Sequence, residues 1–397
     1  MTSAGVQAGG APGVAAGGSW SVQTRRDDEA FGPLAEEWEA LYASCSAATP
    51  FQSYGWVESW WREYGRTGRL RLVLVHKEGR LVAAAPLMLR RRGPWRVLLP
   101  LGGDQSDFHD ILVDDACAPT ACQMVAQALV AEPGWHVLDV PQARPGAAAE
   151  HLYSGWAGAR WRTRGSACLQ IPAGSLPDLF ARLPAGTVYR LRTKLRKAEA
   201  AGIEVRCVGG ADVEAGVHAL LRLHEQQWRG RGINEEHLQP RFRRHLARSV
   251  NRMADRGQAA LVQFWLAGRL VASDLDLVGH SFVGAYLGGF EPGLRRQVDV
   301  AVMMAAQAFT LAEQRQRPVL SLLRGTEPYK MRFHPVAVRN QRLLLARHGG
   351  PGAAAGYAWA VRARTALADA TRDRLPWLRR ARHRIRQAAA RLAARWR

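Results

Sequence analysis

The sequence predicts an α/β (α+β) protein of two tandem units, each with a mixed, largely antiparallel sheet flanked by helices. Short apolar runs separated by glycine turns indicate antiparallel strands, and residues 258–290 contain three such runs in succession. The same pattern occurs at residues 70–89, which indicates an internal repeat. Amphipathic segments between these runs predict the helices.

An identical pentapeptide, Gly-Arg-Leu-Val-Ala, carries the repeat. It starts at Gly79 and again at Gly268, each time directly after an apolar strand. The same elements follow each copy, an apolar helix (117–131 and 298–314) and a short strand (135–140 and 318–323). This shared order predicts a duplicated α/β unit rather than a chance match.

The composition limits the number of domains and the cellular location to be expected. The chain has 397 residues, 47% of them hydrophobic, which suffices for two cores. Its five cysteines form no CxxC pair and no signal peptide is visible, so we expect a cytoplasmic protein without disulfides or a bound metal. We expect a disordered leader at 1–24, a first domain at 25–185, a second at 186–348, and a linker with an Arg-rich amphipathic helix at 349–397.

Positive charge is concentrated at the end of the chain. The net charge is +21, and residues 361–397 hold twelve arginines against two aspartates. Within them, 376–396 has apolar residues at helical spacing, which suits an anionic membrane surface on the inner face of the plasma membrane. Binding of this segment to an acidic partner or to nucleic acid is less favoured. The remaining interpretation is a helix that packs on its own domain.

Two helices, 33–46 and 52–64, begin the first unit. The second carries Tyr54, Trp56, Trp60 and Trp61, more aromatic residues than one buried stripe requires. Such a helix fits between two domains, or its aromatic side chains, Trp61 among them, line a site for a sugar or acyl substrate.

The loop 104–110 holds three carboxylates and a histidine just after a predicted strand. Asp107, His109 or Asp110 could take a proton from an amine or hydroxyl. The alternative is a polar loop with Asx turns. Residues 144–184 show a weaker pattern of helix, strand and helix.

The second unit begins with a basic helix at 187–201. Its cations, Arg190 and Lys194 among them, form either an anion clamp for phosphate or a solvated face. Helices at 211–229 and 236–255 follow. Within the strands of 258–290, Asp274 and Asp276 share one face, which lies either in solvent or along a groove.

A loop after the strand 318–323 carries three cations. Arg324, Lys330 and Arg332 lie just past the carboxyl end of a core strand, where open α/β sheets bind ligands. A last strand, VRNQRLLLAR, completes the second unit.

Residues 187–335 resemble the GNAT-type acyltransferase domain of proteins associated with bacterial cellulose and exopolysaccharide biosynthesis. The resemblance rests on four segments, YRLRTKLRKAEAAG, LLRLHEQQW, GRLVASDLDL and LLRGTEPYKMRF, of which the last is the most specific. The first half, with WVESWW and SDFHD, is also similar to this group. Tandem GNAT folds are found in the related Fem-type aminoacyltransferases, which agrees with the internal repeat.

The resemblance implies acyl transfer from acyl-CoA, such as acetyl-CoA, as co-substrate, with no permanently bound cofactor. Lys330 would hold an acceptor phosphate or the developing oxyanion, Arg324 and Arg332 would support it, and Asp274 and Tyr286 would line the acyl cleft. The further candidates for contact with substrate are Tyr329, Trp61, Arg190 and Lys194.

The sequence departs from the family at one turn. GNAT proteins that use acetyl-CoA hold its pyrophosphate with a glycine-rich turn at a helix start. Here residues 294–301 contain no glycine, and Asp299 would oppose an anion. Either Arg295 and Arg296 compensate as donor-binding residues, or the donor differs, or this unit binds only an acceptor.

These observations leave three alternative functions. The first is acylation of an amine or hydroxyl on a saccharide precursor of the cell envelope or exopolysaccharide, small or linked to lipid or nucleotide. The second is Fem-type transfer from aminoacyl-tRNA to a peptidoglycan precursor, which the basic charge favours. The third is a non-catalytic accessory protein of polysaccharide synthesis held at the membrane.

Overall fold

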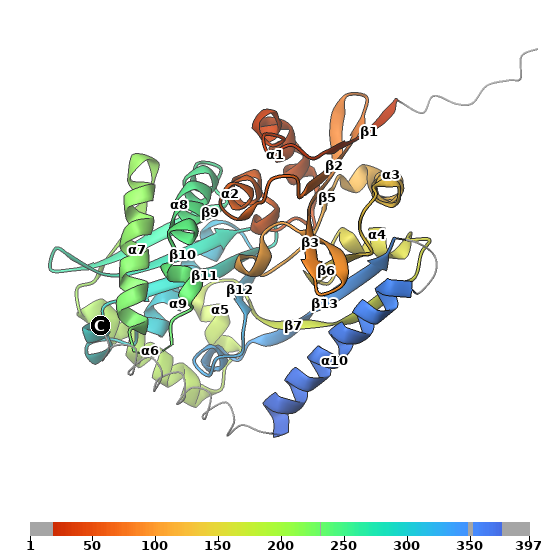
Figure 1. Ribbon diagram of the computed structural model, residues 1–397. Helices are drawn as coiled ribbons and strands as arrows, with labels where there is room; N and C mark the ends of the chain where they lie inside the picture. Colours follow the sequence, from red (N-terminus) through yellow and green to blue (C-terminus); the bar gives the residue numbers. More distant parts are fainter. Residues whose placement is uncertain (1–18, 231, 348–351, 375–397) are drawn as a thin grey trace, which may run out of the picture.

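One continuous sheet runs through the molecule. The computed structural model describes residues 19–230, 232–347 and 352–374. Their strands form a single thirteen-stranded sheet in the order β1-β2-β3-β4-β6-β13-β7-β12-β11-β10-β9-β8, with β5 paired to β3. Figure 1 shows the first unit in red to yellow and the second in green to cyan, with β7, β12 and β13 between them.

The first half of the chain contains seven strands and five helices of the described residues. They are β1 (Trp20–Arg25), α1 (Ala35–Ser44), α2 (Tyr54–Tyr64), β2 (Leu70–Lys77), β3 (Arg80–Arg92), β4 (Trp95–Pro100), β5 (Leu112–Val113), α3 (Ala118–Ala131), β6 (Val137–Ala143), α4 (Ala149–Ser154), β7 (Arg160–Pro172) and α5 (Leu176–Ala181).

The second half contains six strands and five helices within the same described ranges. They are α6 (Ala185–Ala200), β8 (Glu204–Val208), α7 (Val213–Trp228), α8 (Pro240–Asp255), β9 (Ala259–Leu266), β10 (Arg269–Val278), β11 (Phe282–Phe290), α9 (Val300–Gln314), β12 (Val319–Arg324), β13 (Val336–Ala346) and α10 (Gly352–Arg374).

The strand order confirms the duplication. Read inward from its two edges, the sheet gives β1-β2-β3-β4-β6 on one side and β8-β9-β10-β11-β12 on the other. The two pentapeptides form the turns into β3 and β10, and α3 and α9 stand in the same place in each unit. The predicted fold class, two tandem units with mixed and largely antiparallel sheets flanked by helices, is confirmed.

The two units exchange their last strands. β7 pairs antiparallel with β12 of the second unit, whereas β13 pairs antiparallel with β6 of the first, and β7 and β13 pair with each other. The sheet is therefore continuous across the domain boundary that the sequence predicts at 185/186.

Helices α2 and α8 pack against each other between the units. The Ser59 hydroxyl donates to the His245 carbonyl over 2.9 Å, and Arg252 pairs with the buried Glu58 over 2.5 Å. The four aromatic residues Tyr54, Trp56, Trp60 and Trp61 of α2 are buried, and Trp61 is only 4% exposed within the core of the first unit. This helix thus lies between units, and Trp61 has no surface left for a substrate.

Both ends of the described chain differ from expectation. The leader was expected to extend to residue 24, but Trp20–Arg25 form β1, because their backbone groups pair with β2. Helix α10 was not predicted; it packs Tyr357, Ala358 and Val361 against Val97 and neighbouring apolar residues of the first unit. The predicted helix at 376–396 lies outside the described residues. Within the described ranges, no helix has the length and apolar character needed to cross a bilayer.

Candidate active site

A cleft of about 1260 Å³ lies where the sheet of the second unit divides. β11 and β12 pair in parallel only from Phe282 to Gly284, and beyond this point the strands separate. The cleft is lined by residues from β11, β12, α6, α7, α9 and the loop 104–107 of the first unit. Both units therefore build it.

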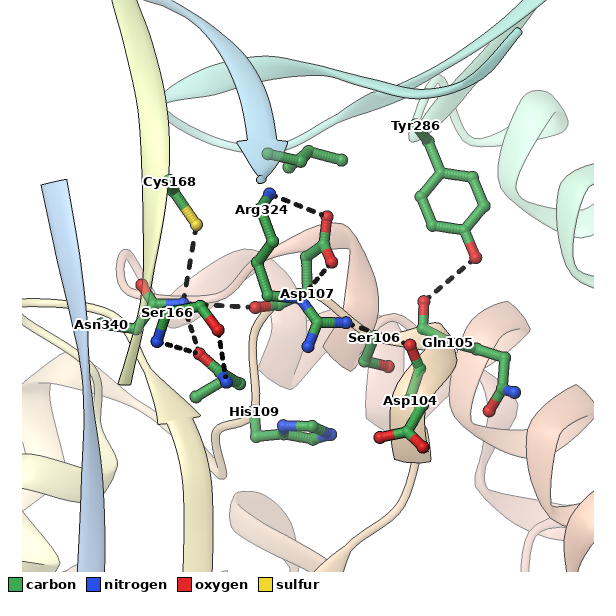
Figure 2. Close-up of polar contacts among 12 residues, drawn as sticks. Asp104, Gln105, Ser106, Asp107, His109, Ser166, Cys168, Tyr286, Arg324 and Asn340 are labelled. Atoms are coloured by element: carbon green, nitrogen blue, oxygen red, sulfur yellow. Dashed lines mark hydrogen bonds and ion pairs between the residues drawn. The ribbon is translucent and has the colours of Figure 1, made fainter. Parts of the chain in front are cut away.

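Arg324 joins the two units at the rim of the cleft. Its guanidinium forms an ion pair with Asp107, its backbone N–H donates to the same carboxylate over 3.3 Å, and Nη2 donates to the Asp104 carbonyl over 3.0 Å. Figure 2 shows these contacts beside the hydroxyl of Tyr286, which donates to the Gln105 carbonyl over 3.0 Å. Asp107 is thus committed to holding Arg324 and is not a free base.

Irregular backbone at the end of β12 directs Arg324 toward the first unit. The pairing of β12 with β7 shifts register between Ser321 and Arg324. Leu323 has φ +56° and Gly325 φ +107°, and a left-handed conformation is unfavourable for a leucine. A bulge of this kind turns a side chain away from the regular ladder, here across the gap between units.

Two carboxyl groups are buried on β10. Asp274 is 7% exposed and lines the cleft, whereas Asp276 is 1% exposed, so neither is solvent-facing. Burial raises the pKa of Asp274 to about 7. Burial and the charge of Asp274 also raise the pKa of Asp276 well above its usual value. Near neutral pH the pair holds a proton inside the protein.

A glycine keeps space above Asp274. Gly288 is its partner in the β10–β11 register. A Cβ atom at position 288 would lie 3.2 Å from Asp274 Oδ1 and 3.4 Å from Met304 Sδ of α9. A side chain at position 288 would fill the space between the Asp274 carboxyl group and α9. The glycine therefore leaves Asp274 accessible from the cleft.

Lys330 is buried at the end of the loop that follows β12. Its Nζ donates to the Arg324 carbonyl over 2.9 Å and pairs with Glu327 over 2.9 Å. An ammonium group has three hydrogens, so among the residues that the structure describes these two partners leave one hydrogen for a ligand. Tyr329 lines the same cleft and is 46% exposed.

Asp299 occupies the N-terminus of α9. Its carboxylate accepts from the Val302 backbone N–H over 3.3 Å and pairs with Lys194 over 2.6 Å and Arg332 over 2.9 Å. Burial raises the pKa of Asp299, but the hydrogen bond and charge of Lys194, with the charge of Arg332, outweigh it and hold the pKa below its usual value. The place where a pyrophosphate would meet the helix is filled by the protein's own anion.

Nine of the thirteen candidate residues line this cleft. They are Lys330, Asp274, Asp107, Arg295, Tyr286, Arg324, Arg332, Tyr329 and Lys194. The guanidinium of Arg295 also lies 4.7 Å from the ring centre of Phe290.

The other four candidates lie elsewhere. Asp110 is buried and accepts from the backbone N–H groups of Ala148 and Ala149 over 2.9 and 2.7 Å at the start of α4, so its carboxylate is structural. Arg190 is exposed and donates to Thr187 on its own helix. Arg296 is exposed outside the lining, and Trp61 is in the core.

Two histidines that received no role from the sequence also line the cleft. His224 of α7 and His237 of the short segment Glu235–Leu238 come together although they lie thirteen positions apart in the sequence. No motif in the sequence marked this place. Among the described residues, no cluster of metal ligands is present.

Comparison with known proteins identifies the second unit. The family model for the acetyltransferase (GNAT) domain matches residues 185–331. This segment is similar to the GNAT acetyltransferase domain. The match includes most of the second-unit residues that line the cleft, and the first unit repeats the same order of strands.

Solved structures share the fold across both units. FemX is 11% identical with a TM-score of 0.55, over 78% of this chain and 95% of that chain. The C-terminal DUF2156 domain of a protein provisionally named lysylphosphatidylglycerol synthetase, from Agrobacterium fabrum, is 13% identical with a TM-score of 0.52, over 85% and 97%. At such identities the likeness concerns the fold alone. No curated protein sequence matches significantly.

Proposed function

We propose that the protein transfers an acyl group from a thioester or ester donor to an amine or hydroxyl of a cell-envelope or exopolysaccharide precursor. The observation that carries the proposal is the divided sheet, which leaves a cleft with a buried carboxyl group, Asp274, and a buried ammonium group, Lys330, in its lining. These groups supply a proton and a positive charge where acyl transfer needs both.

Each group has a distinct role in the proposed reaction. Lys330 directs its remaining hydrogen at the oxygen of the donor carbonyl and stabilises its negative charge during attack. Asp274, protonated near neutral pH, gives its proton to the leaving thiol or hydroxyl. Asp107 does not touch substrate; it positions Arg324.

A panel of donors and acceptors tests the proposal. The full-length protein is incubated with acyl-CoAs of different chain length and with amino sugars and nucleotide-linked sugars, and free thiol is measured. We expect thiol release that depends on the acceptor, and a Lys330→Ala variant that lacks it. Release at the buffer rate across the panel, together with a negative aminoacyl-tRNA assay, would refute acyl transfer.

The start of α9 does not fit acyl-CoA bound in the usual GNAT manner. The Asp299 carboxylate already caps the helix, and a pyrophosphate there would meet a like charge. Transfer from aminoacyl-tRNA is therefore the second candidate, because such a donor needs no pyrophosphate at this turn. Retention of the acyl label from charged tRNA, but not from acyl-CoA, would select it.

Removal of the Asp299 charge should create affinity for CoA. In an Asp299→Asn variant, Lys194 and Arg332 lose their anionic partner while asparagine still caps α9. We expect CoA to bind at least roughly tenfold more tightly than to the wild type, a gain of about 1.4 kcal/mol. Isothermal titration calorimetry measures it, with Asp255→Asn as a surface control. Equal affinities would show that Asp299 does not exclude the pyrophosphate.

The basic end of the chain is proposed to hold the protein on an anionic membrane surface, in the cytoplasm. Residues 375–397 contain eight arginines and no acidic residue, and they follow α10, which is anchored to the first unit. We expect the full chain to sediment with vesicles containing anionic lipid, and removal of 375–397 to abolish this at 0.15 M salt. Equal sedimentation of both forms would exclude the role. Vesicles of neutral lipid are the control.

A further inference from the structure

Two histidines form a hydrogen-bonded chain that ends in the cleft. His224 Nδ1 lies 2.8 Å from the Gly288 carbonyl oxygen, and His224 Nε2 lies 3.1 Å from His237 Nδ1. Both rings line the cleft. The chain therefore runs from the backbone of β11 through two imidazoles toward the space for substrate.

The chemistry of the contacts fixes both tautomers. A carbonyl oxygen only accepts, so His224 Nδ1 carries the hydrogen and, in a neutral ring, Nε2 holds a lone pair. That lone pair must accept from His237, so His237 Nδ1 also carries a hydrogen. The lone pair of His237 is thus placed on Nε2, and among the described residues no donor is bonded to it.

Packing holds the two rings in this orientation. A Cβ atom at Gly289 would lie 2.4 Å from the backbone N of His224, so only glycine lets α7 approach β11 closely enough for the first hydrogen bond. The ring of His237 stacks on Phe242 with centroids 4.6 Å apart and planes at 18°. The second ring cannot rotate without losing this stacking.

The surroundings keep both rings neutral. Burial lowers the pKa of His224, and burial followed by the charge of His224 lowers that of His237 to about 4, against the attraction of Glu236. Glu236 itself accepts from the Tyr64 hydroxyl over 2.8 Å and pairs with Arg241, so it is not bonded to His237. The other ring beside His224 is Trp228, which carries no charge.

We propose that His237 is the base that takes the proton from the acceptor, and that His224 positions it. The inference rests on the proposed acyl transfer. As the acceptor nitrogen or oxygen forms its bond to the donor carbonyl carbon, its proton passes to His237 Nε2. The bond to the donor sulfur or oxygen then breaks, the leaving group takes a proton from Asp274, and the proton on His237 returns to Asp274.

The tautomers can be measured without any substrate. In full-length protein labelled with ¹⁵N-histidine, long-range ¹⁵N–¹H spectra distinguish Nδ1–H from Nε2–H rings, and His224→Gln and His237→Gln variants assign the signals among the twelve histidines. We expect both residues in the Nδ1–H form at pH 7. A hydrogen on Nε2 of His237 would overturn the proposal.

Activity tests the same pair independently. With the donor and acceptor that give the largest thiol release or label transfer, we expect His237→Gln to lower kcat by about 10²–10⁴-fold. His224→Gln should lower kcat less, leave KM within about twofold, and move the acidic limb of the kcat–pH profile. The control is His218→Gln, on α7 but outside the cleft lining.

The possible failures are distinguishable. A wild type that transfers acyl groups beside an equally active His237→Gln variant overturns only the role of His237. If His224→Gln changes kcat without moving the pH profile, His224 is structural and does not position the base. A wild type inactive with every donor removes the proposed function and the base role together.

Discussion

Replacement of Asp274 by asparagine is expected to lower kcat for acyl transfer by about 10²–10⁴-fold, with KM changed little. Asparagine has the shape of the protonated carboxyl group but cannot release a proton to the leaving thiol or hydroxyl. The site should therefore bind substrate and fail in the chemical step. Steady-state kinetics of the purified variant measures both parameters.

The pH dependence gives a second measure of the same group. Since burial raises the pKa of Asp274 to about 7, the proton that it donates is lost above that pH, and wild-type kcat should fall there. In the Asp274→Asn variant the remaining activity should lack this fall. A variant with wild-type kcat, or one whose activity falls in the same way above pH 7, would remove Asp274 from the mechanism.

Stability supplies the control for folding. The pKa of Asp274 is higher in the folded than in the unfolded chain, so the folded state binds more protons and its stability falls as pH rises from about 4 to about 7. An asparagine at position 274 does not titrate and so causes no such loss of stability as pH rises. Relative to wild type, the variant should gain stability across this range, which urea unfolding at both pH values detects. If the variant is more stable than the wild type, a loss of its activity cannot be attributed to unfolding.

Much of the fold could be predicted because its signals are local. Apolar alternation and glycine turns located β9, β10 and β11 within residues 258–290. The pentapeptide repeat gave the duplication. The exchange of β7 and β13 has no such signal, because a strand's sequence favours burial without naming its partner.

The lining of the cleft was predictable where a cation follows a strand, as at Lys330, or where a carboxylate alternates along one, as at Asp274. It was not predictable where the contacts of a side chain are with residues far away in the sequence. Asp110 caps α4 from 38 residues away, and Trp61 fills a core that strands from elsewhere complete. The role proposed for His237 depends on its contact with His224. That contact depends in turn on how closely α7 lies on a glycine of β11.

The exchanged strand is held by a buried charge cluster. Asp139 of β6 is fully buried; Arg342 of β13 pairs with it over 2.5 Å, and the Tyr357 hydroxyl of α10 donates to it over 2.6 Å. One carboxylate thus joins the first unit to a strand and a helix from the end of the chain. Arg92, 3.5 Å away, is the more distant cation.

Arg342→Met should destabilise the protein by about 3–5 kcal/mol, because it leaves the Asp139 carboxylate buried with most of its compensation removed. Urea unfolding followed by circular dichroism measures the change. Arg339→Met, the same substitution at an exposed position of β13, should stay within about 0.5 kcal/mol of wild type. A double variant, Asp139→Leu with Arg342→Met, should recover most of the loss, since it removes the charge together with its partner. If the single and double variants were equally unstable, packing of the arginine stem rather than an unpaired carboxylate would hold β13 to the first unit.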